Sequence, residues 1–240
     1  MSALPVNPSL SREAYSFVRQ RILRGDLKLG QVISRRKLAD ELGMSFLPVS
    51  EALLRLEVEG LLESRPRAGT RVRIPTEEDV LGHYVVREAL EVQAARLFSE
   101  NATDEEKASL LQLARSVDAM SVDPDSDRVV YLTQHERLHH CIAEMTRCEA
   151  LLKAIDHTHA LASTWMCVGS GISGHQPERH QSLVAILSLG DPAAAEQAMR
   201  EHVRSSQTDA LVRLAPYFRL QRSTGATYAR SAKRQQAAVI

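Results

Sequence analysis

Apolar positions spaced three and four residues apart predict two short helices in the first quarter of the chain. Ser34 is placed to cap the first helix and Gly43 to end it. Ser45 begins the second helix, and Gly60 ends it. The inward-facing residues that define the pattern are Leu38, Ala39 and Leu42, followed by Val49, Ala52, Leu53 and Leu56. Two short helices joined by such a tight turn are typical of a helix-turn-helix.

Two short strands are predicted directly after the second helix. They cover residues 61–64 and 70–73, and between them lies a basic segment with Arg65 and Arg67. Pro75 then interrupts the second strand. Residues 1–74 are therefore predicted to form a winged helix-turn-helix, a domain that binds DNA by placing its second helix in the major groove.

Charge is divided unevenly between the two parts of the chain. Residues 1–73 hold 13 Lys or Arg against 8 Asp or Glu, whereas residues 74–240 hold 17 against 22, so the net charge of zero hides a basic N-terminal part. A basic surface favours phosphate contact and salt-sensitive binding. The expected DNA contacts are Arg35, Arg36, Lys37, Ser45, Phe46, Leu47, Ser50, Arg55, Arg65 and Arg67.

The remainder of the chain has a helical pattern. Thr76, followed by three acidic residues, begins the first helix of this part, and Pro216 is expected to kink or break the last one. The predicted helices cover residues 77–100, 104–119, 125–146, 148–168, 177–189 and 192–221. The predicted fold is mainly α, with an N-terminal winged helix-turn-helix and a C-terminal all-α helical bundle. The expected domains are 1–74, 75–222 and a basic, mobile tail at 223–240.

Composition excludes several classes of protein. The 240 residues suffice for two domains, and 44% hydrophobic with 25% charged residues is typical of a soluble protein. The sequence contains no apolar run of 18 residues and no signal-peptide core, so we expect no membrane contact and a cytoplasmic location. Cys141, Cys148 and Cys167 are odd in number and lack CxxC spacing, which predicts reduced, mostly buried thiols.

Several short blocks in the N-terminal domain occur in an order known from one protein family. They are Leu38-Ala39, Gly43-Met44-Ser45, Pro48-Val49, Glu51-Ala52-Leu53, Leu56-Glu57, Glu59-Gly60-Leu61 and Gly69. In this order they resemble the GntR family of bacterial transcription regulators, and the helical remainder resembles its FadR-like branch. The resemblance implies a homodimer on a pseudo-palindromic operator, acting as a repressor that responds to a small organic acid.

Two positions of the second helix depart from the family. Phe46 and Ser50 stand where the resembling proteins usually carry Arg, and both positions commonly touch DNA. Neither side chain can bond guanine through O6 and N7, as Arg does. We therefore expect a different operator, with Phe46 against a thymine methyl group and Ser50 on a phosphate.

Four histidines form a second candidate site. His135 and His139 are four residues apart and share one helix face, and His180 and His202 lie on two further helices. The resembling family binds a metal with an Asp at the first of these positions and His at the other three. Four neutral imidazoles favour zinc or nickel over magnesium or calcium. A metal sensor without an organic effector remains an alternative.

Two further features leave alternatives open. His135-Glu136-Arg137-Leu138-His139 matches HExxH, the zinc motif of metalloproteases, although no strands are predicted after residue 74 to frame such a site. A metal-dependent hydrolase is therefore an alternative, and no enzyme activity is expected. The resemblance places Arg87 in an effector cavity, where it would pair with a carboxylate; a salt bridge from Arg87 to Glu91 is equally consistent with the spacing.

Overall fold

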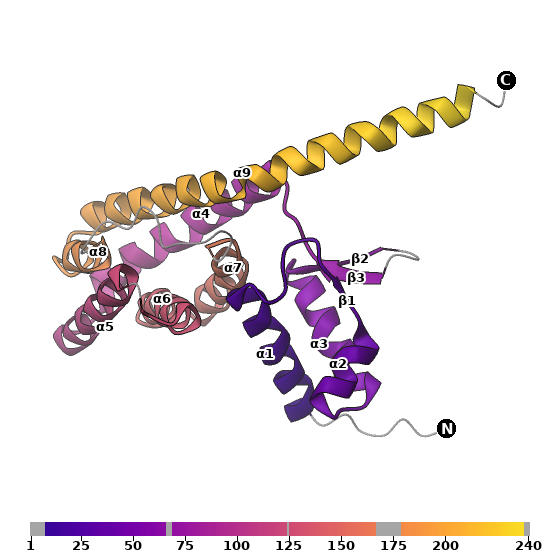
Figure 1. Cartoon of the computed structure of the whole chain (residues 1–240). Helices are drawn as coiled ribbons and strands as arrows, with labels where there is room; N and C mark the ends of the chain where they lie inside the picture. The colour runs from indigo at the N-terminus through magenta and orange to yellow at the C-terminus, as the bar shows by residue number, and fades with distance from the viewer. Residues whose placement is uncertain (1–7, 66–68, 124, 167–178, 238–240) are drawn as a thin grey trace.

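The computed structural model describes the backbone of residues 8–65, 69–123, 125–166 and 179–237 (Figure 1). It describes side chains in the same ranges except at 8–9, 160 and 220–237. An N-terminal domain of three helices and a small sheet lies beside a helical C-terminal domain. The predicted fold class is confirmed. No helix in these ranges is long and apolar enough to cross a membrane.

The N-terminal domain consists of α1 (Pro8–Arg24), β1 (Val32–Ile33), α2 (Arg35–Leu42), α3 (Phe46–Val58), β2 (Leu62–Arg65) and β3 (Gly69–Val72). The strands form an antiparallel sheet in the order β1-β3-β2. Ser34 caps α2 by accepting a hydrogen bond from the Lys37 backbone N–H, and Gly43 ends it with a φ of 61°, which a residue with a Cβ rarely adopts. The helix-turn-helix and its wing thus follow the sequence prediction.

Two elements of this domain were not predicted. Helix α1 carries Ala14, Val18 and Ile22 at intervals of four residues, and all three are buried in the domain core. Strand β1 pairs with β3 through only two residues, Val32 and Ile33. The spacing in α1 is a helical signal, whereas a strand of two residues is too short to show any periodicity.

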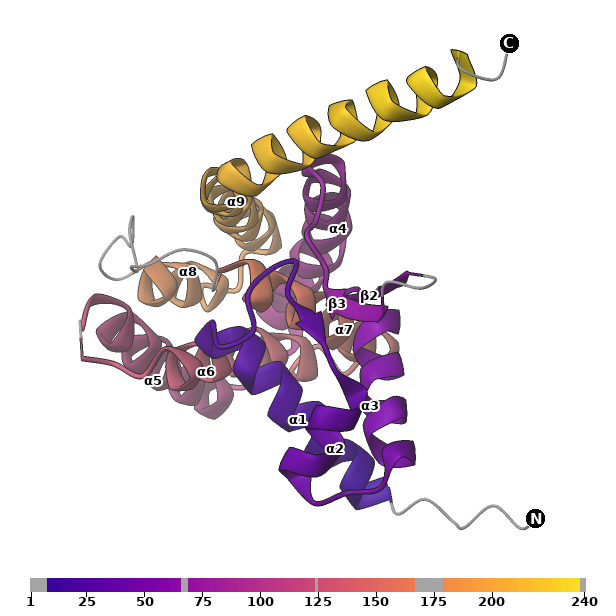
Figure 2. The same ribbon diagram turned by 45° about the vertical axis from the view of Figure 1, so that its right-hand side comes forward.

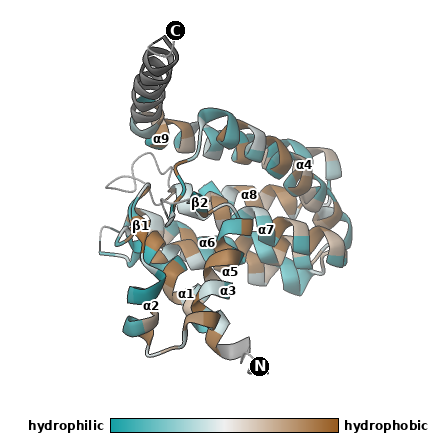
Figure 3. Ribbon diagram, turned by 90° about the vertical axis from the view of Figure 1, so that its right-hand side faces the viewer, coloured by the Kyte–Doolittle hydropathy of each residue, from teal (hydrophilic) through white to brown (hydrophobic). Residues whose placement is uncertain are grey.

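The C-terminal domain consists of six helices: α4 (Glu77–Asn101), α5 (Asp104–Val122), α6 (Arg128–Glu144), α7 (Glu149–Met166), α8 (Arg179–Leu187) and α9 (Pro192–Ala237). Thr76 and Thr103 cap α4 and α5, each with an acidic residue that bonds back to the cap. Brown and teal alternate along each ribbon in Figure 3, as expected for helices with one buried face. Trp165 lies in this core.

The last helix differs from the prediction. Helix α9 is continuous through Pro216 and extends past the expected end near residue 221 to Ala237. It packs mainly along α4, and its C-terminal part extends away from the other helices (Figures 1 and 2). Cys141 and Cys148 are free thiols and half-buried, whereas Cys167 lies outside the described residues.

Contacts at several places join the two domains. Leu23 of α1 is buried against Val129, Tyr131 and Leu132 of α6. Arg19 of α1 forms an ion pair with Glu136 of α6. Leu161 of α7 packs against the N-terminal core and lies beside Gly60, at the turn between α3 and β2. Helices α6 and α7 therefore carry the DNA-binding domain.

Candidate metal centre and nucleic-acid interface

Three helices bring four histidines together inside the C-terminal domain. His135 and His139 come from consecutive turns of α6, His180 from α8 and His202 from α9. Each has a ring nitrogen within 4.8 Å of those of the other three, and none is more than 6% exposed. The four residues singled out from the sequence thus form one buried cluster.

Several ring nitrogens of this cluster lack hydrogen-bond partners among the described residues. They include Nδ1 of His135, Nε2 of His180 and both ring nitrogens of His202. Burying a polar atom without a partner costs free energy, so such atoms usually have a ligand or water. Four buried imidazoles with free nitrogens fit a divalent metal ion that prefers nitrogen ligands.

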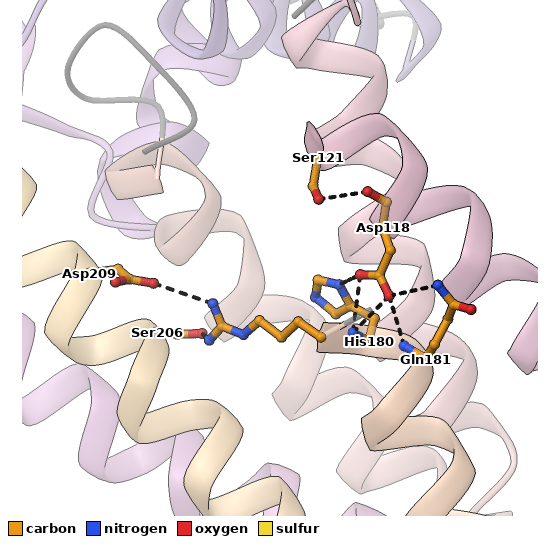
Figure 4. Close-up of polar contacts among 7 residues, drawn as sticks. Asp118, Ser121, His180, Gln181, Ser206 and Asp209 are labelled. Atoms are coloured by element: carbon orange, nitrogen blue, oxygen red, sulfur yellow. Dashed lines mark hydrogen bonds and ion pairs between the residues drawn. The ribbon is translucent and has the colours of Figure 1, made fainter. Parts of the chain in front are cut away.

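Asp118 of α5 fixes the ring of His180. Its Oδ1 lies 2.6 Å from Nδ1 of His180, and its carboxylate also accepts the backbone N–H groups of His180 and Gln181 (Figure 4). Although burial raises the pKa of Asp118, these hydrogen bonds hold it below its usual value. Because a carboxylate only accepts hydrogen bonds, Nδ1 of His180 carries the proton, and its Nε2 keeps a lone pair that faces the cluster.

Glu91 of α4 lies close to His139. Its Oε2 lies 2.8 Å from Nδ1 of His139, and its Oε1 lies 2.7 Å from Nε of Arg87 and 3.3 Å from Nε2 of His159. Burial alone would raise the pKa of Glu91, but Arg87, His159 and His139 hold it well below its usual value. Glu91 is thus a buried carboxylate that accepts a hydrogen bond from Arg87 and has two imidazole rings close by.

The pKa values of His135, His139, His202 and His83 are lowered, so these side chains stay neutral below the usual pKa of histidine. Burial lowers the pKa of His139 to about 3, and burial together with neighbouring rings or cations lowers the pKa of His135 and His202. His83, whose Nε2 lies 3.0 Å from the Thr158 carbonyl oxygen, has its pKa lowered to about 4, mainly by burial. Neutral imidazole is the form that ligates metals.

We expect the free energy of unfolding to fall as the pH drops below about 6.5, the pKa of histidine in an unfolded chain. Below that pH the unfolded chain binds protons that the folded protein does not. Each such histidine therefore removes up to about 1.4 kcal/mol per pH unit until its folded pKa is reached. For His83 and His139 these limits are about 4 and 3. Chemical denaturation between about pH 7.5 and 5 measures this, and a flat profile would contradict it.

Glu136, the acidic residue of the HExxH match, does not belong to the cluster. It is in an ion pair with Arg19 of α1, on the side of α6 that faces the DNA-binding domain. A metalloprotease needs this carboxylate beside the metal-bound water. The match therefore arises from two cluster histidines at helical spacing and lacks the geometry of a hydrolase.

Arg87 forms the salt bridge that its spacing suggested, and its contact with an effector stays a prediction. Its Nε is bonded to Glu91, as the one-turn spacing indicated. Its Nη1 and Nη2 are buried and have no hydrogen-bond partner among the described residues, and the same is true of the hydroxyl of Tyr84, whose ring lies 5.0 Å from the guanidinium carbon. Two free guanidinium nitrogens beside the histidine cluster can bind a carboxylate.

The expected DNA contacts divide into two groups. Arg36, Lys37, Ser45, Phe46 and Leu47 are exposed at the N-terminal ends of α2 and α3. The others are partly engaged within the protein: Arg35 bonds to Thr70, Arg55 pairs with Glu59 and lies over Tyr15, Arg65 lies 3.6 Å from Glu63, and the Ser50 hydroxyl is buried. Arg67 lies outside the described residues.

The expected phosphate contact requires the Ser50 hydroxyl to face solvent. In the structure it does not. Ser50 is half-buried, and its Oγ is enclosed without a hydrogen-bond partner in the described part of the chain. The next buried residues of α3, Ala52 and Leu53, pack in the domain core. The exposed N-terminal residues of α3 are thus the better placed of the expected contacts.

A winged helix-turn-helix joined to a helical domain with a buried histidine cluster defines a class of two-domain DNA-binding transcription regulators. The chain matches the model of bacterial regulatory proteins of the gntR family over residues 10–72 and that of the FCD domain over residues 83–205. The protein belongs to the GntR family and carries an FCD domain. Enzyme activity is not a property of this family.

Similar proteins agree with this assignment. A probable D-xylose utilization operon transcriptional repressor of Paenarthrobacter nicotinovorans is 32% identical over 201 residues, which are 81% of this chain and 86% of that protein. The structure of McbR/YncC from E. coli has a TM-score of 0.69 at 20% identity and covers 89% of this chain and 100% of its own. A putative GntR regulator from Rhodococcus sp. RHA1 also has a TM-score of 0.69 at 20% identity, over 85% of this chain and 98% of its own.

Three polar residues beside the cluster were missed by the sequence analysis as parts of this site. Asp118, Glu91 and His159 lie on α5, α4 and α7, and each reaches the cluster across a helix packing contact. Glu91 was considered only as a salt-bridge partner of Arg87. Contacts between helices leave no spacing in the sequence, so no local pattern could have identified these residues.

Proposed function

We propose that this DNA-binding transcription regulator is a repressor whose affinity for a pseudo-palindromic operator is modulated by a small organic acid at a metal centre. The repressor role is supported by similar proteins named as repressors, including GlaR of E. coli at 22% identity. The observation that carries the metal centre is the buried cluster of four histidines with unpartnered nitrogens. The proposed location is the cytoplasm, where a bacterial regulator meets its operator DNA.

The metal is proposed to be zinc or nickel. His135, His139, His180 and His202 would hold it, with Asp118 and Glu91 orienting two of the rings. When bound, a divalent ion supplies a positive centre that attracts an anionic ligand. Neutral nitrogen ligands do not cancel its charge, and they favour these metals over magnesium and calcium.

The effector is proposed to be a small carboxylic acid bound by Arg87. Its Nη1 and Nη2 are buried and free of partners in the described structure, and Tyr84 offers a hydroxyl next to them. A bidentate bond from a guanidinium to a carboxylate satisfies both buried nitrogens at once. Glu91 keeps Arg87 in place through Nε, which leaves the other two nitrogens for the ligand.

A homodimer is proposed to form through α4 and α9. These helices run antiparallel, since Arg96 lies near Glu196 and Glu88 binds Arg200 and Arg204. Beyond Glu88 and Arg204 this side also carries exposed apolar residues. They are Leu81 and Val85 of α4 and Val212 of α9, which are 41%, 68% and 71% exposed. A second copy would cover this patch and set the distance between two α3 helices on a palindrome.

Metal analysis of the purified protein tests the metal centre. Operator binding is then measured with and without a chelator and with a panel of carboxylic acids. A bound metal and an acid-dependent change in operator affinity would support the full proposal. If metal alone changes the affinity and no acid adds to it, the protein is a metal sensor instead. If neither has an effect, the modulation is refuted.

We expect Arg19→Ala and Glu136→Ala to weaken the response of operator affinity to the ligand. Their ion pair joins the helix of His135 to α1 and is about four-fifths buried. An allosteric coupling of about 1 to 3 kcal/mol should fall when such a connection is removed. Arg21→Ala is the matched control, because Arg21 is on the same helix but pairs with Glu41 inside the DNA-binding domain, at 2.8 Å. Equal effects of Arg21→Ala and Arg19→Ala would contradict this connection.

A further inference from the structure

Helix α3 presents large apolar side chains to solvent. Phe46 and Leu47 in its first turn are 56% and 46% exposed, and Leu54 and Val58 further along are 60% and 74% exposed. The opposite side of the helix is packed in the domain core. A helix in a small soluble domain usually carries polar residues on its free side. The free side of α3 therefore has an apolar character that the domain core does not require.

Donors that identify purines are missing from this surface. Residues 46–58 contain no Lys, Asn or Gln, and their single Arg is Arg55. The Arg55 guanidinium carbon lies 4.1 Å from the centre of the Tyr15 ring, and its Nε is 3.0 Å from Glu59. Guanine is usually recognised by Arg, and adenine by Asn or Gln. The first two turns of α3 therefore cannot recognise a base through these bidentate bonds.

Glu51 adds an acceptor to the same side. It follows Leu47 by one helical turn and is exposed. The major-groove edge of guanine presents two acceptors, N7 and O6, which a carboxylate repels, whereas cytosine offers an N4 donor. The apolar residues and Glu51 together disfavour a guanine on the strand that they face.

Cations beside this surface match a DNA backbone. Arg36 and Lys37 in the first turn of α2 are exposed, and the N-terminal end of α3 carries the positive pole of its helix dipole. A surface with an apolar centre and cationic margins is complementary to thymine methyl groups flanked by phosphates. A protein partner with an apolar surface would not need these cations.

We propose that Phe46 and Leu47 are specificity-determining residues that recognise the C5 methyl groups of thymines in the operator. This inference rests on the DNA-binding function of the protein. Recognition would come from apolar contact in the major groove, and Arg36 and Lys37 would hold the helix on the backbone without selecting a base.

The experiment begins with selection of bound duplexes from random DNA by the full-length protein. Each thymine of the selected half-site is then replaced by deoxyuridine, which lacks only the methyl group. We expect wild-type affinity to fall about three- to fivefold at each contacted thymine, from the loss of one buried methyl group. In Phe46→Ala or Leu47→Ala the penalty should disappear at the thymine that the residue contacts.

Val58→Ala is the matched control, because Val58 is also exposed and apolar but lies at the far end of α3. It should retain every deoxyuridine penalty, and circular dichroism checks that all variants are folded. The proposal is overturned if deoxyuridine has no effect on the wild type. It is also overturned if the penalties persist in both variants, or if Phe46→Ala changes self-association and not DNA binding. Failure to select any sequence would instead contradict sequence-specific DNA binding as a whole.

Discussion

Arg87→Met is expected to lower the free energy of unfolding by about 3 to 5 kcal/mol. Arg87 and Glu91 are each 1% exposed, and Nε of Arg87 lies 2.7 Å from Oε1 of Glu91. Removal of the guanidinium leaves a buried carboxylate without the Arg87 cation that offsets its desolvation. Chemical denaturation of the metal-free variant and wild type measures the difference.

Arg96→Met on the same helix is the matched control for this prediction. Arg96 pairs with Glu100 at the same spacing, but the two side chains are 49% and 37% exposed. Such a surface pair contributes about 0 to 1 kcal/mol. The double variant Arg87→Met/Glu91→Leu removes both charges and should recover much of the stability. The prediction is contradicted if Arg87→Met lowers the free energy of unfolding no more than Arg96→Met does. Glu91 would then not need the Arg87 cation to stay buried.

Asp118→Asn is expected to lower metal affinity about 10- to 100-fold while the fold is kept. The Asn carbonyl oxygen can still accept the backbone N–H of Gln181, so the N-terminal end of α8 retains a hydrogen bond. The Asn amide, in contrast, donates where the carboxylate accepted from Nδ1 of His180. This favours the tautomer with the proton on Nε2, which removes the lone pair that faces the cluster.

Competition with a chromophoric chelator measures the metal affinity. Thermal unfolding of the metal-free proteins shows whether a change in affinity comes from a loss of protein stability. The control is Asp209→Asn. It also replaces a carboxylate, but the ion pair of Asp209 is with Arg179, at 3.3 Å, and not with a histidine of the cluster. Asp118→Asn with wild-type affinity would refute the orienting role of Asp118. A wild-type protein that binds no metal would refute the metal centre itself, so the two failures are distinguishable.

Local patterns predicted most of the fold because they act over one or two helical turns. Ser34 and Gly43 mark the ends of α2 in the sequence and in the structure. The end of α9 was placed too early, since the expected break at Pro216 does not occur and the helix continues to Ala237. The division into domains at 1–74, 75–222 and 223–240 stays a prediction.

The candidate site was predictable in part. His135 and His139 share a face by spacing alone, and resemblance to a known family added His180 and His202. The residues that orient them come from other helices, and neither composition nor periodicity indicates which helix faces come into contact. The same limit applies to Ser50, whose hydroxyl is turned inward although its position on α3 predicted an exposed one.

The contacts of Arg19 and Leu161 also have a mechanical consequence. A domain attached at several separate points cannot pivot freely, and it moves only when the helices that carry those points move. The DNA-binding domain is attached to α6 through Arg19 and to α7 through the contact of Leu161 beside Gly60. Glu91 contacts His139 of α6 and His159 of α7, so the two helices that hold the DNA-binding domain meet at the same carboxylate. We therefore expect a ligand near Glu91 to move each recognition helix by shifting α6 and α7.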